Sequence, residues 1–291
     1  MNLVELVKVT SSEEEAEKFL RAKGILKTFD RCSFCGHQKI ERIRRSFFKC
    51  YGCRKEWSIR KDSILEGLKI SFTKFILAVK LFILEVPVNK TYKELNLAYN
   101  TTHKIYNRIR QCIFKFVSED DEFLSGEVEM DESYFGGRRK VKRGRGAKGK
   151  IPVFGILERE GRVKVKIVKD VAAETLLRET IKKVKRGSII YTDKFKAYDG
   201  LVIYGFKHER IDKSIMFSNG KVYINGIEGF WSYAKERLLK FHGVSREYFV
   251  YYLKELEFRY NFRVNLDEIR CVCSYKIIRD YRIQSKLGGM I

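Results

Sequence analysis

Hydrophobic and polar positions along the chain change their period near residue 126. Before this point, apolar residues recur at helical spacing in two long segments, residues 72–86 and about 102–116. Between these segments, Thr91 and Glu94 have the spacing of a capping box, which predicts that a short helix begins there. The first half of the chain is therefore predicted to hold three helices in succession.

After residue 126 the pattern becomes that of strands. An alternating segment ends at Asp131, and the segments IPVFGILE and RVKVKIVK predict a hairpin that turns at Glu160 and Gly161. A helix is expected over 172–186, followed by a short buried strand, SIIY, and by a fifth strand, LVIYGF. Two helices complete the region, over 224–241 and 245–262. This order predicts an α/β fold with a mixed sheet.

The charge of the chain indicates a polyanionic partner. The 60 Lys and Arg residues outnumber the 37 Asp and Glu residues, which gives a formal net charge of +23. Nucleic acid is the commonest partner for such an excess. A membrane is disfavoured, because Lys74, Lys80 and Glu85 interrupt the longest apolar segment and the first residues lack the pattern of a secretory signal. We therefore expect a cytoplasmic, nucleoid-associated protein that binds double-stranded DNA.

Four of the seven cysteines form two CxxC pairs separated by fourteen residues. The pairs are Cys32 with Cys35 and Cys50 with Cys53. Four thiolates at this spacing can bind one structural Zn²⁺ ion in tetrahedral geometry, whereas four unrelated buried cysteines would not be expected in pairs. Four cysteines are enough for the ion, so His37 is expected to be a bystander. Basic residues around the pairs favour contact with DNA phosphates: Arg42, Arg44, Arg45, Lys49, Arg54 and Lys55.

The third predicted helix has a polar face opposite its apolar stripe. The stripe consists of Ile105, Ile109, Cys112 and Phe116, and we expect it to pack in the core. The opposite face carries side chains that can donate to phosphates and to base edges in a major groove: Lys104, Asn107, Arg108, Gln111 and Lys115. A three-helix bundle with a solvated polar face has the same pattern. The charge and the neighbouring cysteine pairs favour a helix-turn-helix-like DNA-binding segment.

Three acidic residues occur where a divalent-metal site on an α/β sheet would need them. Asp131 lies on the first strand, Asp193 ends the fourth, and Glu228 begins a following helix. Carboxylates on the strand order of a ribonuclease-H-like fold can bind two Mg²⁺ or Mn²⁺ ions for phosphodiester chemistry. Lys235 lies two helical turns after Glu228 and so on the same face, where it could bind a DNA phosphate.

Each of these acids also has an ordinary structural explanation. Asp131 could be a surface carboxylate, with Glu129 as a rival on the same strand face and Glu132 on the opposite face. Asp193 could cap a turn, and Glu228 could be a first-turn acid that the helix dipole favours. We prefer the metal-site interpretation because all three acids fall on one strand order.

The motifs MDESYFGG, YTDKFKAY and INGIEGFWSYAKERL, preceded by the cysteine pairs, resemble the DDE insertion-sequence transposases with an N-terminal zinc ribbon, a group related to eukaryotic Merlin elements. The resemblance extends over roughly residues 32–262. It implies that three acids bind the catalytic metal beside one basic residue: Asp131, Asp193, Glu228 and Lys235. In this group the third position can be an asparagine, so Asn225 is the alternative to Glu228.

A basic segment, RRKVKRGRGAKGK, occupies residues 138–150. Because it follows the strand of Asp131, we expect it to clamp DNA near the scissile phosphate through residues that include Arg143, Arg145 and Lys148. The alternative is a mobile, solvated loop.

The expected organisation has five parts: a helical lead-in (1–29), a zinc ribbon (30–62), a helix-turn-helix-like segment (63–122), a ribonuclease-H-like catalytic domain (123–265) and a C-terminal tail (266–291). The expected function is a transposase that cleaves transposon ends and joins the 3′-OH to target DNA, as a homo-oligomer on DNA. The alternatives are a catalytically inactive DNA-binding regulator and a related nuclease or resolvase without strand transfer.

Overall fold

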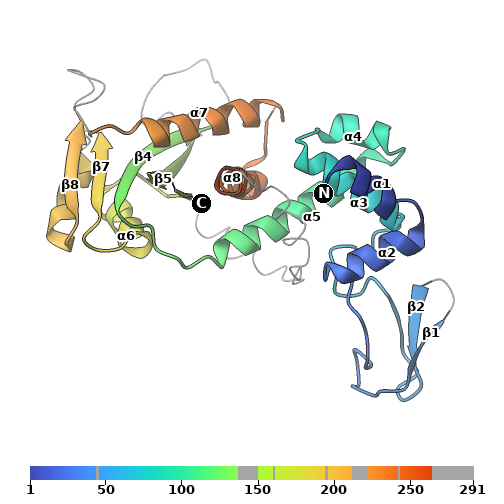
Figure 1. The fold of residues 1–291 in the computed structure, drawn as a ribbon. Coiled ribbons are helices and arrows are strands. Elements are labelled where there is room, and N and C mark those ends of the chain that lie inside the picture. Colours follow the sequence, from blue (N-terminus) through green and yellow to red (C-terminus); the bar gives the residue numbers. More distant parts are fainter. Residues whose placement is uncertain are drawn as a thin grey trace. The chain divides into compact units, whose positions relative to one another are not determined.

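The computed structural model describes seven segments of the chain: 1–43, 46–136, 150–159, 161–193, 196–211, 222–241 and 243–263. The described residues fall into two compact units, Met1–Phe116 and Val117–Arg263 (Figure 1). Within these segments, every helix is too short or too polar to cross a bilayer.

Two helices, α1 (Leu3–Val9) and α2 (Glu13–Ala22), open the first unit. The side chain of Ser12 caps α2 by accepting a hydrogen bond from the backbone N–H of Glu15. Glu13 accepts a hydrogen bond from the backbone N–H of Phe72 at 2.8 Å. This contact joins the start of α2 to the start of a later helix.

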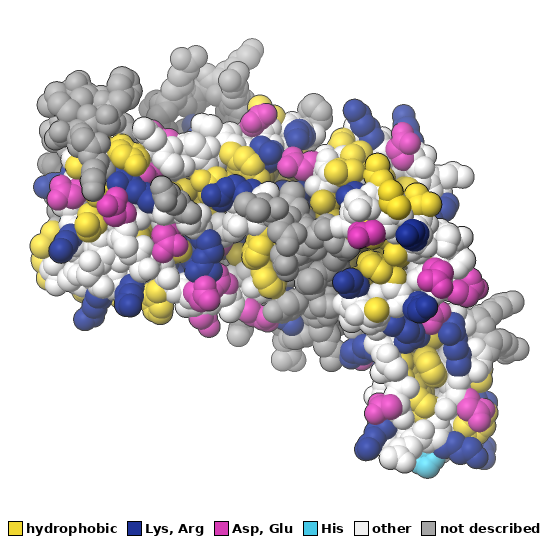
Figure 2. Space-filling model, in the orientation of Figure 1, with side chains coloured by type: hydrophobic (Ala, Val, Ile, Leu, Met, Phe, Trp, Pro, Cys, Tyr) yellow, Lys and Arg dark blue, Asp and Glu magenta, His cyan; other side chains and the backbone are white. Residues whose placement is uncertain are grey.

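A small antiparallel sheet follows, made of β1 (Ile40–Ile43), β2 (Phe47–Cys50) and β3 (Glu56–Ser58) in the order β1-β2-β3. Its core consists of aromatic rings beside cysteines, with Phe48 and Trp57 stacked at a centroid distance of 5.8 Å. Lys and Arg side chains are prominent on the face of this sheet seen in Figure 2. The arrangement confirms the predicted ribbon fold.

Three helices complete the first unit: α3 (Phe72–Ile83), α4 (Val88–Glu94) and α5 (Tyr99–Ser118). Four residues separate α4 from α5, which is the connection length of a helix-turn-helix. The prediction that α4 begins at Thr91 is wrong. The helix begins directly after Pro87, and Thr91 is buried inside it with its hydroxyl 2.8 Å from that of Tyr106.

A five-stranded mixed sheet forms the centre of the second unit, in the order β6-β5-β4-β7-β8. The strands are β4 (Glu127–Phe135), β5 (Ile151–Glu158), β6 (Val163–Ile167), β7 (Ile189–Asp193) and β8 (Lys207–Ile211). The first three strands form an antiparallel meander, whereas β7 is parallel to β4 and β8 is parallel to β7. This topology confirms the predicted ribonuclease-H-like fold.

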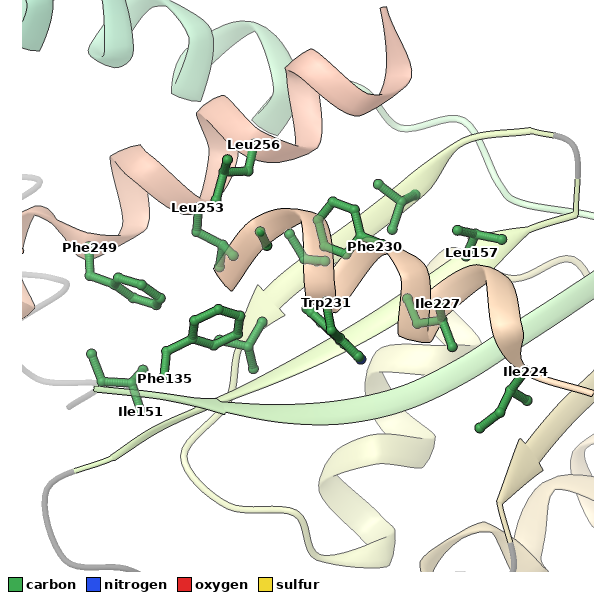
Figure 3. Packing of buried hydrophobic residues seen from close by; sticks show 14 of the residues in the cluster. Phe135, Ile151, Leu157, Ile224, Ile227, Phe230, Trp231, Phe249, Leu253 and Leu256 are labelled. Carbon is green, nitrogen blue, oxygen red and sulfur yellow. The ribbon is translucent and has the colours of Figure 1, made fainter. Parts of the chain in front are cut away.

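Helices cover both faces of this sheet (Figure 1). One face packs against α6 (Ala173–Lys183) and the 3₁₀ helix η2 (Lys196–Tyr204), the other against α7 (Asn225–Leu239) and α8 (Arg246–Asn261). On the face of α7 toward the sheet, Ile227, Trp231 and Ala234 are all buried in the core (Figure 3).

The predicted end of α6 is wrong. The helix was expected to continue to residue 186, but it ends at Lys183. The next residue, Val184, leaves the helix to form a parallel bridge with Leu124, and a tertiary contact therefore overrides the local helical pattern.

The prediction of a strand at LVIYGF is also wrong. Most of this segment lies in η2, and the fifth strand is the following KHERI. Leu201 and Phe206 are buried, whereas the residues 202–204 between them are exposed, a pattern that suits a short helical turn rather than a strand. Because β8 is a mostly polar edge strand, it lacks the apolar alternation that marks a strand in the sequence.

At the opposite edge of the sheet, α8 covers β6. The side chain of Asn261 accepts a hydrogen bond from the N–H of Val163 at 2.8 Å and donates to its carbonyl at 2.9 Å. Glu257 accepts from the N–H of Val165 at 3.0 Å. Burial raises the pKa of Glu257, although Lys254 acts in the opposite direction. These side chains replace a neighbouring strand and prevent further pairing at this edge.

Candidate active site and cysteine cluster

The candidate catalytic aspartates lie on two neighbouring parallel strands, β4 and β7. The register pairs Glu127 with Ile189 and Glu129 with Tyr191. The pairing ends there, and Asp131 of β4 and Asp193 of β7 each lie two residues further along their strands. Adjacent strands are about 4.8 Å apart, and residues two positions apart share a face. Both aspartates therefore lie on the face of the sheet that α7 covers.

Asp131 is in direct contact with α7. Its Oδ2 accepts a hydrogen bond from the indole Nε1 of Trp231 at 3.1 Å. Asp131 lies within β4, which extends four residues beyond it to Phe135, and not at the strand end as the sequence pattern predicted. Strand residues therefore precede and follow Asp131, and its backbone pairs with Gly155 of β5.

Glu129, the rival to Asp131, holds the start of α7. It lies on the same strand face, as predicted, but only 1% of its side chain is exposed. Its Oε2 accepts from the backbone N–H of Ile227 at 2.9 Å, and the N-cap residue Ile224 has no side-chain cap of its own. A Cβ on Gly226 would lie 2.9 Å from the same oxygen. Glu129 therefore acts as a helix cap supplied by the sheet.

Arg159 completes this cap. Its guanidinium donates to Glu129 at 3.1 Å and to Glu127 at 2.6 Å, and it lies over the rings of Tyr191 and Tyr223 at 3.7 and 3.9 Å. Burial alone would lower the pKa of Arg159, but the bonds to the two glutamates outweigh it and raise the pKa. No local sequence pattern marks Arg159 for this role, because its partners lie on three other segments of the chain.

The remaining candidate residues lie along α7. Glu228 and Asn225, the two candidates for the third ligand, are both exposed in its first turn. Lys235 is exposed two turns after Glu228, and its Nζ lies 5.9 Å from the ring centroid of Phe135, the last residue of β4. The helix thus runs along β4 with Trp231 between Glu228 and Lys235.

The opposite face of the sheet carries a second polar set. Glu132 accepts a hydrogen bond from the hydroxyl of the buried Tyr198 at 2.9 Å, which agrees with the prediction that it points away from Asp131. Burial, followed by the charge of Glu132, raises the pKa of Tyr198 well above its usual value. His208 lies 2.9 Å from the hydroxyl of Thr192. These contacts join β4 to η2 and β7 to β8 on the face of the sheet opposite Asp131.

Within the described segments, only the four cysteines bring three or more Cys, His, Asp or Glu ligand atoms within 4.8 Å of one another. The Sγ atoms of Cys32 and Cys53 are 3.6 Å apart, as are those of Cys35 and Cys50. Tetrahedral Zn–S bonds of about 2.3 Å would place the sulfurs about 3.8 Å apart. The cluster therefore has the dimensions of a zinc site.

Backbone donors prepare the cluster for a cation. The N–H of Phe34 donates to the Sγ of Cys32, and that of Cys53 to the Sγ of Cys50, both at 3.4 Å. Burial disfavours the thiolate of Cys32, but the backbone N–H groups of Phe34 and Cys35 and the neighbouring thiols outweigh it and lower its pKa to about 6. The backbone N–H of His37 acts to lower the pKa of Cys35, but burial and the neighbouring thiols outweigh it and raise this pKa to about 11, so one sulfur of this pair carries the negative charge more readily than the other. His37 is not part of the cluster.

The polar face of α5 divides into exposed and anchored side chains. Lys104 is exposed, whereas Asn107, Arg108 and Gln111 are half-buried. Arg108 donates to the carbonyl oxygens of Ile64 and Glu66 at 2.6 and 2.7 Å, an intramolecular role that the sequence did not indicate. Three of the predicted DNA-binding residues, Arg143, Arg145 and Lys148, lie outside the described residues, as does the predicted C-terminal tail, 266–291.

Residues 123–261 match the family described as the ISXO2-like transposase domain. An uncharacterized transposase-like protein of Haemophilus influenzae is 47% identical over 95 residues, which cover 33% of this chain and 77% of the relative. An uncharacterized protein in transposable element ISH50 of Halobacterium salinarum is 26% identical over 239 residues, or 73% of this chain and 77% of the relative.

Among solved structures, a chain of the Mos1 strand transfer complex is 12% identical and covers 68% of this chain and 77% of its own length, with a TM-score of 0.29. A similarity at that level adds nothing to the assignment. The matched domain and the Haemophilus relative are sufficient: the chain belongs to the ISXO2-like family of DDE insertion-sequence transposases.

Proposed function

We propose that this chain cleaves the ends of its insertion element and joins the freed 3′-OH to target DNA, with Asp131 and Asp193 as the central metal ligands. The observation that supports the proposal is the parallel β4–β7 pairing, which ends at Glu129 and Tyr191; Asp131 and Asp193 each follow two residues later on the same strand faces. Such a pair of hard oxygen donors suits Mg²⁺ or Mn²⁺.

The donor set fits a pair of divalent cations. Asp131 and Asp193 would contribute from the sheet and Glu228 from α7, and an anionic Glu228 is a better ligand than the amide of Asn225. When bound, the cations would stabilise the charge that develops on the attacking and leaving oxygens. The exposed Lys235 would bind a phosphate oxygen of the DNA end and hold the scissile strand along α7.

The first unit is proposed to bind the element ends. The four cysteines would hold a structural Zn²⁺, which their Sγ separations of 3.6 Å support. The connection between α4 and α5 supports a helix-turn-helix in which α5 enters the major groove and Lys104 contacts DNA. Because two ends must be joined to one target, the active form is proposed to be a homo-oligomer.

The test is a cleavage and joining assay with Mg²⁺ on DNA that carries the element's terminal repeats. Asp131→Asn and Asp193→Asn should each abolish both products while leaving DNA binding intact. Glu174→Gln is the matched control, because Glu174 is exposed on α6, across the sheet from the site. Equal products from wild type and Asp131→Asn would refute the assigned site. End-specific binding without cleavage by the wild type would instead favour a DNA-binding regulator.

A pair of further variants decides the third ligand. Glu228→Gln should abolish cleavage, and Asn225→Ala should retain most of it. The reverse result would transfer the role to Asn225.

A further inference from the structure

We propose that Trp231 is a positioning residue for the Asp131 carboxylate, and that Gly155 on the neighbouring strand is the position that admits its ring. The proposal rests on the proposed role of Asp131 as a metal ligand. Trp231 is not one of the candidate metal ligands, and its side chain is almost entirely buried, at 4% exposure. Its one polar atom nevertheless donates to Asp131 at 3.1 Å.

The ring of Trp231 is confined on several sides. Phe135 and Phe230 contact it edge to face, with centroid distances of 5.9 and 5.2 Å. In Figure 3 the ring extends from α7 toward the sheet, with its nitrogen at the far side from the helix. An indole held in this way has little rotational freedom, so the direction of its N–H is fixed.

Gly155 creates the space for this ring. It lies on β5 directly opposite Asp131 in the β4–β5 register. A Cβ at this position would lie 2.5 and 2.7 Å from two ring carbons of Trp231 and 2.9 Å from Ile227. Contacts under 3.0 Å are not tolerated in a packed core, so any other residue would push the ring and its N–H away from Asp131.

The spacing of two bonds explains why α7 sits in one register on β4. Glu129 accepts from the N–H of Ile227, and Asp131 accepts from Trp231. Two residues of a strand span about 6.7 Å, and four residues of a helix rise about 6.0 Å. The two bonds can therefore form together only when the helix is aligned with the strand in this register. Glu228 lies between the two bonded residues, Ile227 and Trp231, so the same alignment sets its position along β4.

Trp57, in the ribbon, provides a contrast. Within the described part of the chain, its buried Nε1 has no hydrogen-bond partner. The fold therefore tolerates a buried indole that serves only to pack. The N–H of Trp231 differs because its acceptor, Asp131, is a candidate metal ligand. Groups that hydrogen-bond to a ligating side chain fix its orientation and so contribute to metal affinity.

The contrast also supplies the experiment, because the chain contains only two tryptophans. In the full-length Trp57→Phe protein, Trp231 can be replaced during expression by benzothienylalanine, which keeps the ring shape but has sulfur in place of N–H. Mn²⁺ binding is then measured by electron paramagnetic resonance for this protein, its Trp57→Phe parent, Trp231→Phe and Asp131→Asn. Thermal unfolding of each protein reports whether packing is retained.

We expect the analogue to weaken Mn²⁺ binding about 10-fold or more relative to its parent, with an unchanged unfolding temperature. Trp231→Phe should weaken binding at least as much, and Trp57→Phe should bind as wild type. An analogue that binds Mn²⁺ as tightly as its parent, while Asp131→Asn does not bind, would overturn the positioning role alone. Unchanged binding by Asp131→Asn would instead overturn the proposed metal site.

Discussion

The two candidate metal sites of this chain differ in how far the protein assembles them by itself. In the ribbon, four sulfurs from two knuckles already lie within 4.8 Å of one another, and backbone N–H groups point at two of them. In the second unit, the two candidate aspartates lie on one face of neighbouring strands, but the described acids do not form such a cluster. A closed thiolate site is suited to hold the fold, whereas an open carboxylate site is suited to receive a substrate.

Removal of zinc should produce the largest effect and should be confined to the first unit. Structural zinc contributes about 10 kcal/mol or more to the folding of small domains, so chelation or Cys50→Ser should unfold the ribbon. Cys112→Ala is the control, since Cys112 is buried in α5 and burial raises its pKa to about 12, which makes it a poor ligand. Hydrogen exchange would locate the loss. Equal loss of protection in the β4–β8 sheet would contradict the expectation that the effect is confined to the first unit.

Asp131→Asn should affect activity strongly and stability little. Loss of several kcal/mol of charge stabilisation corresponds to a decrease in joining of about 1,000-fold or more. Because the amide keeps the shape of the carboxylate, and can still accept from Trp231, the unfolding temperature should change by only a few degrees. A large decrease in stability would mean that Asp131 serves the fold as the cysteines do, and the distinction between the two sites would fail.

Glu129→Gln should have the opposite profile, although Glu129 lies only two residues from Asp131. The change leaves the guanidinium of Arg159, whose side chain is 11% exposed, without a buried anionic partner. Breaking a buried ion pair costs about 3 kcal/mol or more. Glu127→Gln is the matched control: Glu127 binds the same arginine but is 37% exposed, so its loss should cost less than about 1 kcal/mol. Chemical denaturation measures both.

The difference between these neighbours shows what could be predicted from the sequence. The placement of Asp131 and Asp193 on strands could be predicted because strand order and a two-residue alternation are local patterns, and together they predict a shared face. The role of Glu129 could not be assigned, because its partners Arg159 and Ile227 lie 30 and 98 residues away. The role of Trp231 could not be predicted either, because its bond to Asp131 spans 100 residues and leaves no periodic signal.

The same limit explains two of the errors in secondary structure, the strand at LVIYGF and the end of α6. Apolar content favoured LVIYGF as a strand, but the edge strand that forms is polar and takes its stability from pairing with β7. The helical pattern after residue 172 continued through Val184, but a bridge to Leu124 removes that residue from α6. In both cases a tertiary contact decided the structure where the local pattern was ambiguous.

The distinction between groups that serve the fold and groups that serve a ligand extends to the polar face of α5, where the smallest effect is expected. Lys104 is exposed, whereas Arg108 is bound to two carbonyl oxygens of the preceding segment. Lys104→Gln should therefore lower the salt dependence of end-DNA binding by about one unit of slope and leave the unfolding temperature unchanged. Arg108→Gln should do the reverse, since it leaves carbonyl oxygens without their donor.

Fluorescence anisotropy of labelled end DNA at several salt concentrations, together with thermal unfolding, measures both quantities for both variants. The sequence pattern predicted that Lys104 and Arg108 both contact DNA from one face of the helix. A lower salt slope for Arg108→Gln at unchanged stability would show that Arg108 exchanges its carbonyl partners for phosphates when DNA binds. Arg108 would then serve DNA binding and not the fold, because its bonds to the two carbonyl oxygens would form only in the absence of DNA.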